Sequence, residues 1–200
     1  MEFNAMHLDV LKELGNIGAG NAATSLSQLL NQRVDMNVPD VKLLELKDVP
    51  YILGGADVPV MGVTVLVEGD ADAQILLLFT KESSERLIEN IVAGFSPNDI
   101  SQEIRESVLL EVGNIVGTTF LNALGSFTNM TFIPTVPGIA NDMAGAILDS
   151  VLVTGADGNN IILIVIAEFA VKGEVIDGYL LFVPSPSSLE RIFNALGVSV

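Results

Sequence analysis

The sequence contains no cysteine, no tryptophan and a single histidine, His7. The lack of cysteine excludes disulfides, thiol nucleophiles and thiolate metal sites. With one histidine, neither a multi-histidine metal centre nor a histidine-based catalytic triad is expected. Basic residues are also scarce, because 9 lysines and arginines stand against 25 acidic residues, a formal net charge of −16. A surface this acidic repels phosphate backbones, so nucleic acid is not expected as a partner.

Long hydrophobic runs are absent as well, although 50% of the residues are hydrophobic. The longest, 161–167, falls far short of the roughly 20 residues that a membrane-spanning helix needs. The first residues lack the basic and apolar regions of a signal peptide. We therefore expect a cytoplasmic protein that does not insert into a membrane and that has enough apolar material for a substantial core.

An internal repeat organises the chain. Residues 10–17 read VLKELGNI and residues 108–115 read VLLEVGNI, so most positions are identical. Pro39 and Pro137 keep the same offset, and an LLF segment in each half precedes a similar stretch near its end. The chain is therefore predicted to be a single domain, 1–200, made of two repeats of about 1–98 and 99–200 that are related by a pseudo-twofold axis.

Each repeat is predicted to begin with a long helix. Apolar residues at helical spacing place these helices at about 6–31 and about 99–127. Asp99 and Gln102 form a plausible capping pair at the start of the second helix. These two helices carry the residues that the repeat preserves best.

Strands and a short closing helix follow in each repeat. The predicted strands are 60–67, 74–79, 146–154, 160–167 and 175–183, with turns at 68–72 and 155–159. Ser187 and Glu190 form a capping box for the last helix. Tight turns imply antiparallel pairing, so we expect an α+β fold with a largely antiparallel sheet, two long motif-bearing helices and shorter closing helices.

Helical spacing places three polar side chains of each long helix on one stripe. The two stripes are Asp9, Glu13 and Asn16 in the first repeat and Ser107, Glu111 and Asn114 in the second. A solvated helix face, with acidic residues that complement the helix dipole, would explain either stripe alone. A duplicated core explains less well why Glu and Asn persist where Lys12 is replaced by Leu110. The stripes are therefore candidate functional surfaces.

Glycines flank both stripes, for example Gly18 and Gly113. A glycine in a helix interior costs roughly 1 kcal/mol relative to alanine. We therefore expect another part of the chain, or a partner, to approach these helices closely.

The full pattern is Asp or Ser, three residues, Glu, two residues, Asn, and a Pro after twenty-two more residues. It occurs as Asp9–Glu13–Asn16–Pro39 and again as Ser107–Glu111–Asn114–Pro137. This pattern resembles the signature of the CheC/CheX/FliY family of bacterial chemotaxis, and the resemblance extends over nearly the whole chain. It implies a phosphatase that hydrolyses the aspartyl phosphate of the response regulator CheY. It also implies that Mg²⁺ is held by the regulator and that this chain needs no cofactor of its own.

The resemblance also implies roles for the stripe residues. Asn16 and Asn114 would orient the attacking water. Glu13 and Glu111 would pair with a lysine of the regulator, and Asp9 and Ser107 would assist that contact. Pro39 and Pro137 would shape the loop that supports each site.

Within this family, two copies of the motif in a chain that ends without the switch domain of FliY are typical of the CheC branch, which implies a monomer with two sites. That branch also binds the receptor deamidase CheD. A second interpretation is therefore a regulatory binding module for CheD, with weak or secondary phosphatase activity. Residues 144–149 (AGAILD) are a candidate CheD surface or, equally, the buried start of a strand. A purely structural flagellar component ranks third, since it would require the switch domain.

Overall fold

Antiparallel strands build a single sheet in the computed structural model, which describes residues 5–92, 100–154, 161–171 and 173–197. The strands are β1 (Val34–Glu45), β2 (Pro59–Gly69), β3 (Ala73–Thr80), β4 (Phe132–Pro134), β5 (Gly138–Met143), β6 (Ile161–Val171) and β7 (Glu174–Pro184). Their order is β1-β6-β7-β3-β2-β4, and β5 also pairs with β2. Every pairing is antiparallel, which confirms the predicted α+β class.

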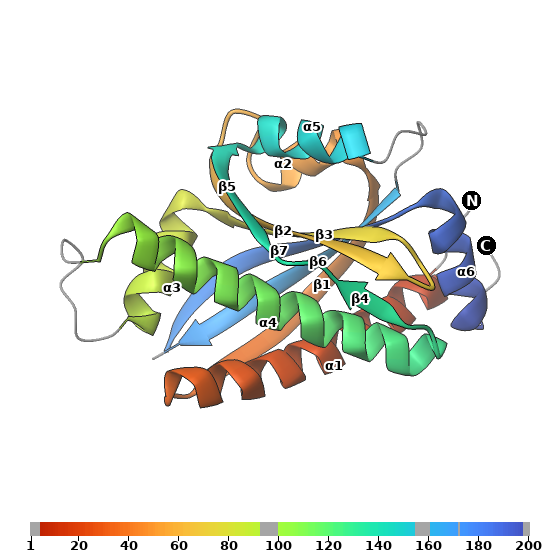
Figure 1. Ribbon diagram of the computed structural model, residues 1–200, viewed down its shortest axis with the longest axis horizontal. Helices are drawn as coiled ribbons and strands as arrows, with labels where there is room; N and C mark the ends of the chain where they lie inside the picture. Colours follow the sequence, from red (N-terminus) through yellow and green to blue (C-terminus); the bar gives the residue numbers. More distant parts are fainter. Residues whose placement is uncertain (1–4, 93–99, 155–160, 172, 198–200) are drawn as a thin grey trace.

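Helices cover both faces of the sheet (Figure 1). They are α1 (Ala5–Leu30), the 3-10 helix η1 (Leu46–Asp48), α2 (Val49–Ile52), α3 (Lys81–Ile91), α4 (Gln102–Thr128), α5 (Ala144–Thr154) and α6 (Pro186–Ala195). The long helices α1 and α4 lie on one face, whereas α2 and α5 lie on the other (Figure 1). Both long helices are followed by an asparagine in the left-handed conformation, Asn31 (φ 47°) and Asn129 (φ 54°). Asparagine is one of the few residues that tolerate this conformation at a helix end.

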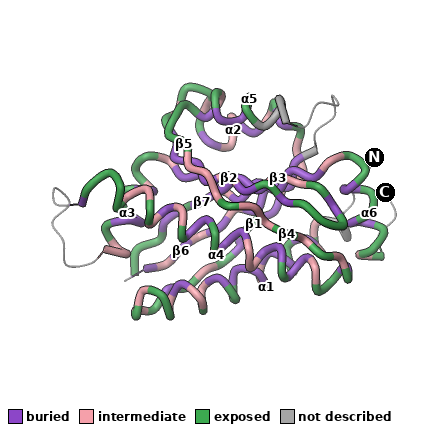
Figure 2. The backbone as a smooth tube through the Cα atoms, in the orientation of Figure 1, coloured by how far each residue is buried: buried purple, intermediate pink, exposed green. Residues whose placement is uncertain are grey.

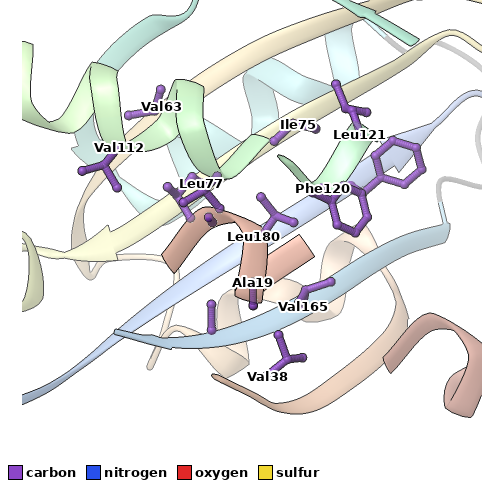
Figure 3. Packing of buried hydrophobic residues seen from close by; sticks show 14 of the residues in the cluster. Ala19, Val38, Val63, Ile75, Leu77, Val112, Phe120, Leu121, Val165 and Leu180 are labelled. Atoms are coloured by element: carbon purple, nitrogen blue, oxygen red, sulfur yellow. The ribbon is translucent and has the colours of Figure 1, made fainter. Parts of the chain in front are cut away.

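The hydrophobic core has two parts, one on each face of the sheet. The larger part joins α1 and α4 to the sheet, and Figure 3 shows Ala19 and Phe120 of the helices close to Leu180 of β7. The smaller part lies under α2 and α5 and includes Leu53 and Ile147. The buried side of each long helix therefore faces the sheet, while the opposite side stays exposed (Figure 2).

Glycines bring the long helices close to their neighbours, as the sequence predicts. A Cβ atom at Gly18 would lie 3.2 Å from Cα of Phe120, so α1 and α4 are in tight contact there. A Cβ atom at Gly113 would collide with the side chain of Val63, so α4 lies directly on β2. Gly20 is different, because it has open space around it.

The helix α4 is also long and apolar enough to cross a membrane by length and composition alone, the one such helix in the part of the chain that the structure describes. The hydrophobic runs of the sequence do not predict a helix of this length and hydropathy. Half of its most apolar 18-residue window is buried inside the protein. Its contacts with α1 and β2 are those of a core helix.

Three predictions of local structure are wrong. Residues 146–154 belong to the helix α5 and not to a strand, because Ala144, Ile147 and Leu148 are buried at helical spacing. The first residue of α4 is capped by Ser101, whose side chain accepts a hydrogen bond from Ile104 N. Gln102 already lies inside α4, and Asp99 and the turn 155–159 lie outside the described residues.

The capping box predicted at Ser187 and Glu190 is the third error. The cap of α6 is Ser185, whose hydroxyl accepts a hydrogen bond from Ser188 N at 3.3 Å. Ser185 has an extended backbone (φ −61°, ψ 155°), as a cap requires, whereas Ser187 already lies inside the helix.

The strand β1 was not predicted, because a bulge interrupts its pattern. Asn37 pairs with Glu168 and Asp40 pairs with Ile166, so β1 carries one extra residue between these pairs. The buried residues shift accordingly, from the even position Val38 to the odd position Val41. Proline fits here because β1 is an edge strand and a bulge needs fewer ladder hydrogen bonds. The bulge places Val38 and Pro39 beside α1.

Candidate functional site

The first stripe lies on the exposed side of α1. Asp9 and Glu13 are exposed and Asn16 is half-buried, while Leu11 and Leu14 between them point into the core. The alternation follows from the helical spacing that the sequence predicts. The structure therefore places these three polar residues on one face, and Asn16 lies next to the start of the β1 bulge.

Asn16 is attached to that bulge. Its carboxamide oxygen accepts a hydrogen bond from Val38 N at 3.3 Å. The bulge leaves Val38 out of the pairing with β6, so its N–H has to find a partner elsewhere. Asn16 is thus a functional candidate that also has a structural task.

Lys12 makes a second contact with the same segment. Its ammonium group donates a hydrogen bond to the carbonyl oxygen of Pro39 at 2.7 Å. Lys12 precedes Asn16 by one helical turn, so the two side chains hold consecutive residues of β1 against α1. Pro39 therefore lies beside the first stripe.

The second stripe lies on α4, and all three of its members are exposed: Ser107, Glu111 and Asn114. The side chain of Asn114 has no hydrogen bond to any other residue that the structure describes. Pro137, half-buried, lies in the connection between β4 and β5. The strands on either side of this connection, β4 and β5, both contact α4.

The two sites differ in the residue before the proline. Val38 is 2% exposed, with its side chain close to Gly15 of α1. Val136, at the same place in the second repeat, is 89% exposed. In the first half the chain runs through as one bulged strand, whereas in the second it breaks into β4 and β5.

The glutamates of both stripes are available for a partner. Four ion pairs are found in the described parts of the chain, and none includes Glu13 or Glu111. No hydrogen bond or ion pair joins one stripe to the other within those same residues. The first site therefore presents two carboxylates and a carboxamide, and the second presents one carboxylate and a carboxamide. Either set can hold a cation of a partner and a polar small molecule such as water.

The described residues contain no group of three or more His, Asp or Glu side chains placed to hold a metal ion. Lys12 and the Val38 N–H are two parts of the first site that the sequence analysis missed. The only signal for Lys12 was its replacement by Leu110 in the second repeat.

Comparison with known proteins gives consistent matches. The profile of the CheC-like family matches residues 6–43, which include the first stripe and Pro39. The CheY-P phosphatase CheC of Bacillus subtilis (strain 168) is 32% identical over 198 residues, covering 96% of this chain and 95% of that protein.

Solved structures match over the same length. The crystal structure of Thermotoga maritima FliY has a TM-score of 0.75 at 19% identity and covers 98% of both chains. The middle domain of FliM from H. pylori has a TM-score of 0.67 at 14% identity, covering 96% of this chain and 99% of that one. At these identities the likeness shows the fold alone.

Proposed function

The chain belongs to the CheC-like family and is a phosphatase, and from this premise we propose that it hydrolyses the aspartyl phosphate of phosphorylated CheY at two sites, one on α1 and one on α4. Support comes from its identity, over nearly the whole chain, with a protein named as a CheY-P phosphatase. The fold does not decide between a phosphatase and a structural flagellar component, because FliM shares it. The decision therefore depends on the stripe residues.

Asn114 is the observation that carries the proposal. Its side chain is exposed and has no hydrogen bond within the described chain, so the fold offers no reason for an asparagine there. Glu111 lies one turn earlier, is also exposed and has no ion pair with any residue that the structure describes. An exposed carboxamide beside an exposed carboxylate is what a residue that enters the active site of a partner requires.

In the proposed mechanism, the asparagine positions water and the glutamate positions the partner. A carboxamide both donates and accepts hydrogen bonds, so Asn16 or Asn114 can hold a water in line with the phosphorus. The water oxygen bonds to phosphorus while the bond to the aspartyl oxygen breaks, which releases phosphate and restores the carboxylate. The Mg²⁺ that neutralises the phosphoryl oxygens belongs to the regulator. Orientation alone can supply several kcal/mol of such a barrier.

The docking contact is proposed for the glutamates. Glu13 and Glu111 would pair with a lysine near the phosphorylation site of CheY, and Asp9 and Ser107 would extend that contact along each helix. Pro39 and Pro137 support the segments beside the two sites. None of these residues needs a cofactor bound to this chain.

The test is the rate of phosphate loss from phosphorylated CheY in the presence of Mg²⁺. We expect the wild-type protein to accelerate the loss and the Asn16→Ala/Asn114→Ala double variant to be inactive, with each single variant retaining part of the activity. Removing a water-positioning group should lower kcat by about 10²-fold or more, and the effect on KM should be small. Asn194→Ala, an exposed helical asparagine on α6, is the matched control and should match wild type.

A wild-type protein without effect on phosphorylated CheY would contradict the proposal. The remaining interpretation is a binding module for CheD. Residues 144–149 form the first turns of α5, where Ala146 and Asp149 are exposed on the face of the sheet opposite α1 and α4 (Figure 1). That surface is free to bind CheD whether or not the stripes are occupied, and titration with CheD is then the next measurement. The monomeric state and the cytoplasmic location stay predictions.

A further inference from the structure

The first site has its carboxamide already engaged. The oxygen of Asn16 accepts the hydrogen bond from Val38 N, and since a backbone N–H can only donate, the assignment of oxygen and nitrogen in this side chain follows from the contact. The oxygen therefore faces β1, and the NH₂ group is the end left for a partner. Because this contact occupies one of the two lone pairs of the oxygen and fixes its direction, an attacking water can reach only the second lone pair unless the contact breaks.

Lys12 reinforces this contact. Lys12 lies one helical turn before Asn16 on α1, and its hydrogen bond to the Pro39 carbonyl holds the residue that follows Val38. The Val38 side chain is itself buried, with a methyl group 3.4 Å from where a Cβ of Gly15 would be. The segment is thus fixed by two polar contacts and one apolar contact, all from α1.

The second site has none of these three contacts. Leu110 stands where the first repeat has Lys12, so no ammonium group is present to hold the segment. Val136 is 89% exposed, and Asn114 has no partner among the described residues. Its carboxamide is free to present either end.

We propose that Lys12 is a positioning residue that keeps the first site latched. The latch is defined as the pair of hydrogen bonds Asn16–Val38 and Lys12–Pro39. In the latched state one lone pair of the Asn16 oxygen is occupied and its direction toward β1 is fixed, so Asn16 orients an attacking water less well and the first site turns over more slowly than the second. This inference depends on the proposed function, because it assigns a difference in rate to the two proposed sites.

The experiment isolates the first site by adding Asn114→Ala. In that background, Lys12→Leu introduces the residue that the second repeat carries, whereas Lys12→Arg keeps a cationic donor. We expect Lys12→Leu to raise kcat for phosphorylated CheY by about two- to tenfold, which corresponds to the net strength of one ordinary hydrogen bond. Lys12→Arg should leave the rate at the parent value. Lys81→Leu removes one exposed cation of α3 and is the control for net charge.

A second readout needs no CheY. Hydrogen exchange of the Val38 amide, followed by NMR, should become faster in Lys12→Leu and stay unchanged in Lys12→Arg and Lys81→Leu. A kcat that falls or stays the same in Lys12→Leu, or an unchanged Val38 exchange rate, would overturn the latch. A protein with only the second site, Asn16→Ala, checks the proposed function separately. If that protein is inactive as well, the phosphatase proposal is wrong, and the inference about the two rates is wrong too. The exchange rate of the Val38 amide still decides whether Lys12 holds the segment.

Discussion

At the scale of single residues, Asn16 and Asn114 occupy equivalent positions, yet in the described chain only Asn16 has a structural partner. A bulge that leaves the Val38 N–H without a strand partner explains an asparagine at the first position. It does not explain one at the second, where the side chain is exposed and has no hydrogen-bond partner among the described residues. A reason shared by both positions has to come from outside the fold. Contact with a partner is such a reason.

The proposed docking role of the glutamates is also a property of single residues. It predicts an effect on KM that can be separated from kcat. Glu111→Gln keeps the size and the acceptor oxygen but removes the charge. We expect KM for phosphorylated CheY to rise by about two- to fivefold, the range of an exposed ion pair, with kcat nearly unchanged. Because salt screens such a pair, the wild-type KM should rise with ionic strength more steeply than that of the variant.

The matched control for this prediction is Glu190→Gln, an exposed glutamate of α6. It removes the same charge outside the stripe and should leave KM near the wild-type value. If Glu111→Gln lowers kcat as strongly as Asn114→Ala and leaves KM unchanged, the glutamate acts on the reaction itself and not on docking.

At the scale of elements, the sequence was sufficient wherever hydrophobic spacing stays regular. The long helices and the strands β2, β3, β6 and β7 were found close to their observed bounds. β1 was missed because its buried positions change parity across the bulge at Pro39. α5 was mistaken for a strand because its β-branched residues outweighed the helical spacing of Ala144, Ile147 and Leu148.

The same limit applies to the candidate site. The stripe residues could be identified from the repeat, since they share one helix each and their spacing alone places them together. The contacts of Lys12 with Pro39 and of Asn16 with Val38 could not. They depend on where β1 passes α1, which is a tertiary relation that no local pattern records.

Packing of α4 on the sheet gives a prediction at this scale. Gly113→Ala would push a methyl group into Val63, and we expect overpacking to destabilise the protein by about 1–3 kcal/mol, reduced by up to about 1 kcal/mol of improved helix propensity. Gly20→Ala is the matched control, because it lies in a helix with open space around it. It should stabilise the protein by up to about 1 kcal/mol. Urea unfolding followed by far-UV circular dichroism measures both, and a Gly113→Ala variant as stable as Gly20→Ala would contradict the close packing of α4.

At the scale of the whole molecule, the two halves interleave in one sheet. β1 of the first half pairs with β6 of the second, and β4 and β5 of the second half pair with β2 of the first. Replacing each strand by its counterpart in the other half gives the same sheet order, read from the opposite edge. In this exchange β4 and β5 together correspond to β1. This correspondence supports the proposed duplication. The edge strand β1 of the first half therefore pairs only with the second half, and the edge strands β4 and β5 of the second half pair only with the first.

The interleaving predicts that neither half folds alone as a monomer. A fragment of 1–98 keeps the β2–β3 hairpin but loses the partner of β1, and a fragment of 99–200 keeps the β6–β7 hairpin but loses the partner of β4 and β5. A single two-stranded hairpin is marginal in water, and each fragment would expose half of the core. We expect each fragment to be unfolded by circular dichroism, and an equimolar mixture to regain the spectrum of the intact chain.

The two halves are similar enough that one fragment can also supply the missing strand to a second copy of itself, so size-exclusion chromatography has to accompany the spectrum. A folded dimer agrees with strand exchange between halves, whereas a folded monomer of either fragment would contradict it.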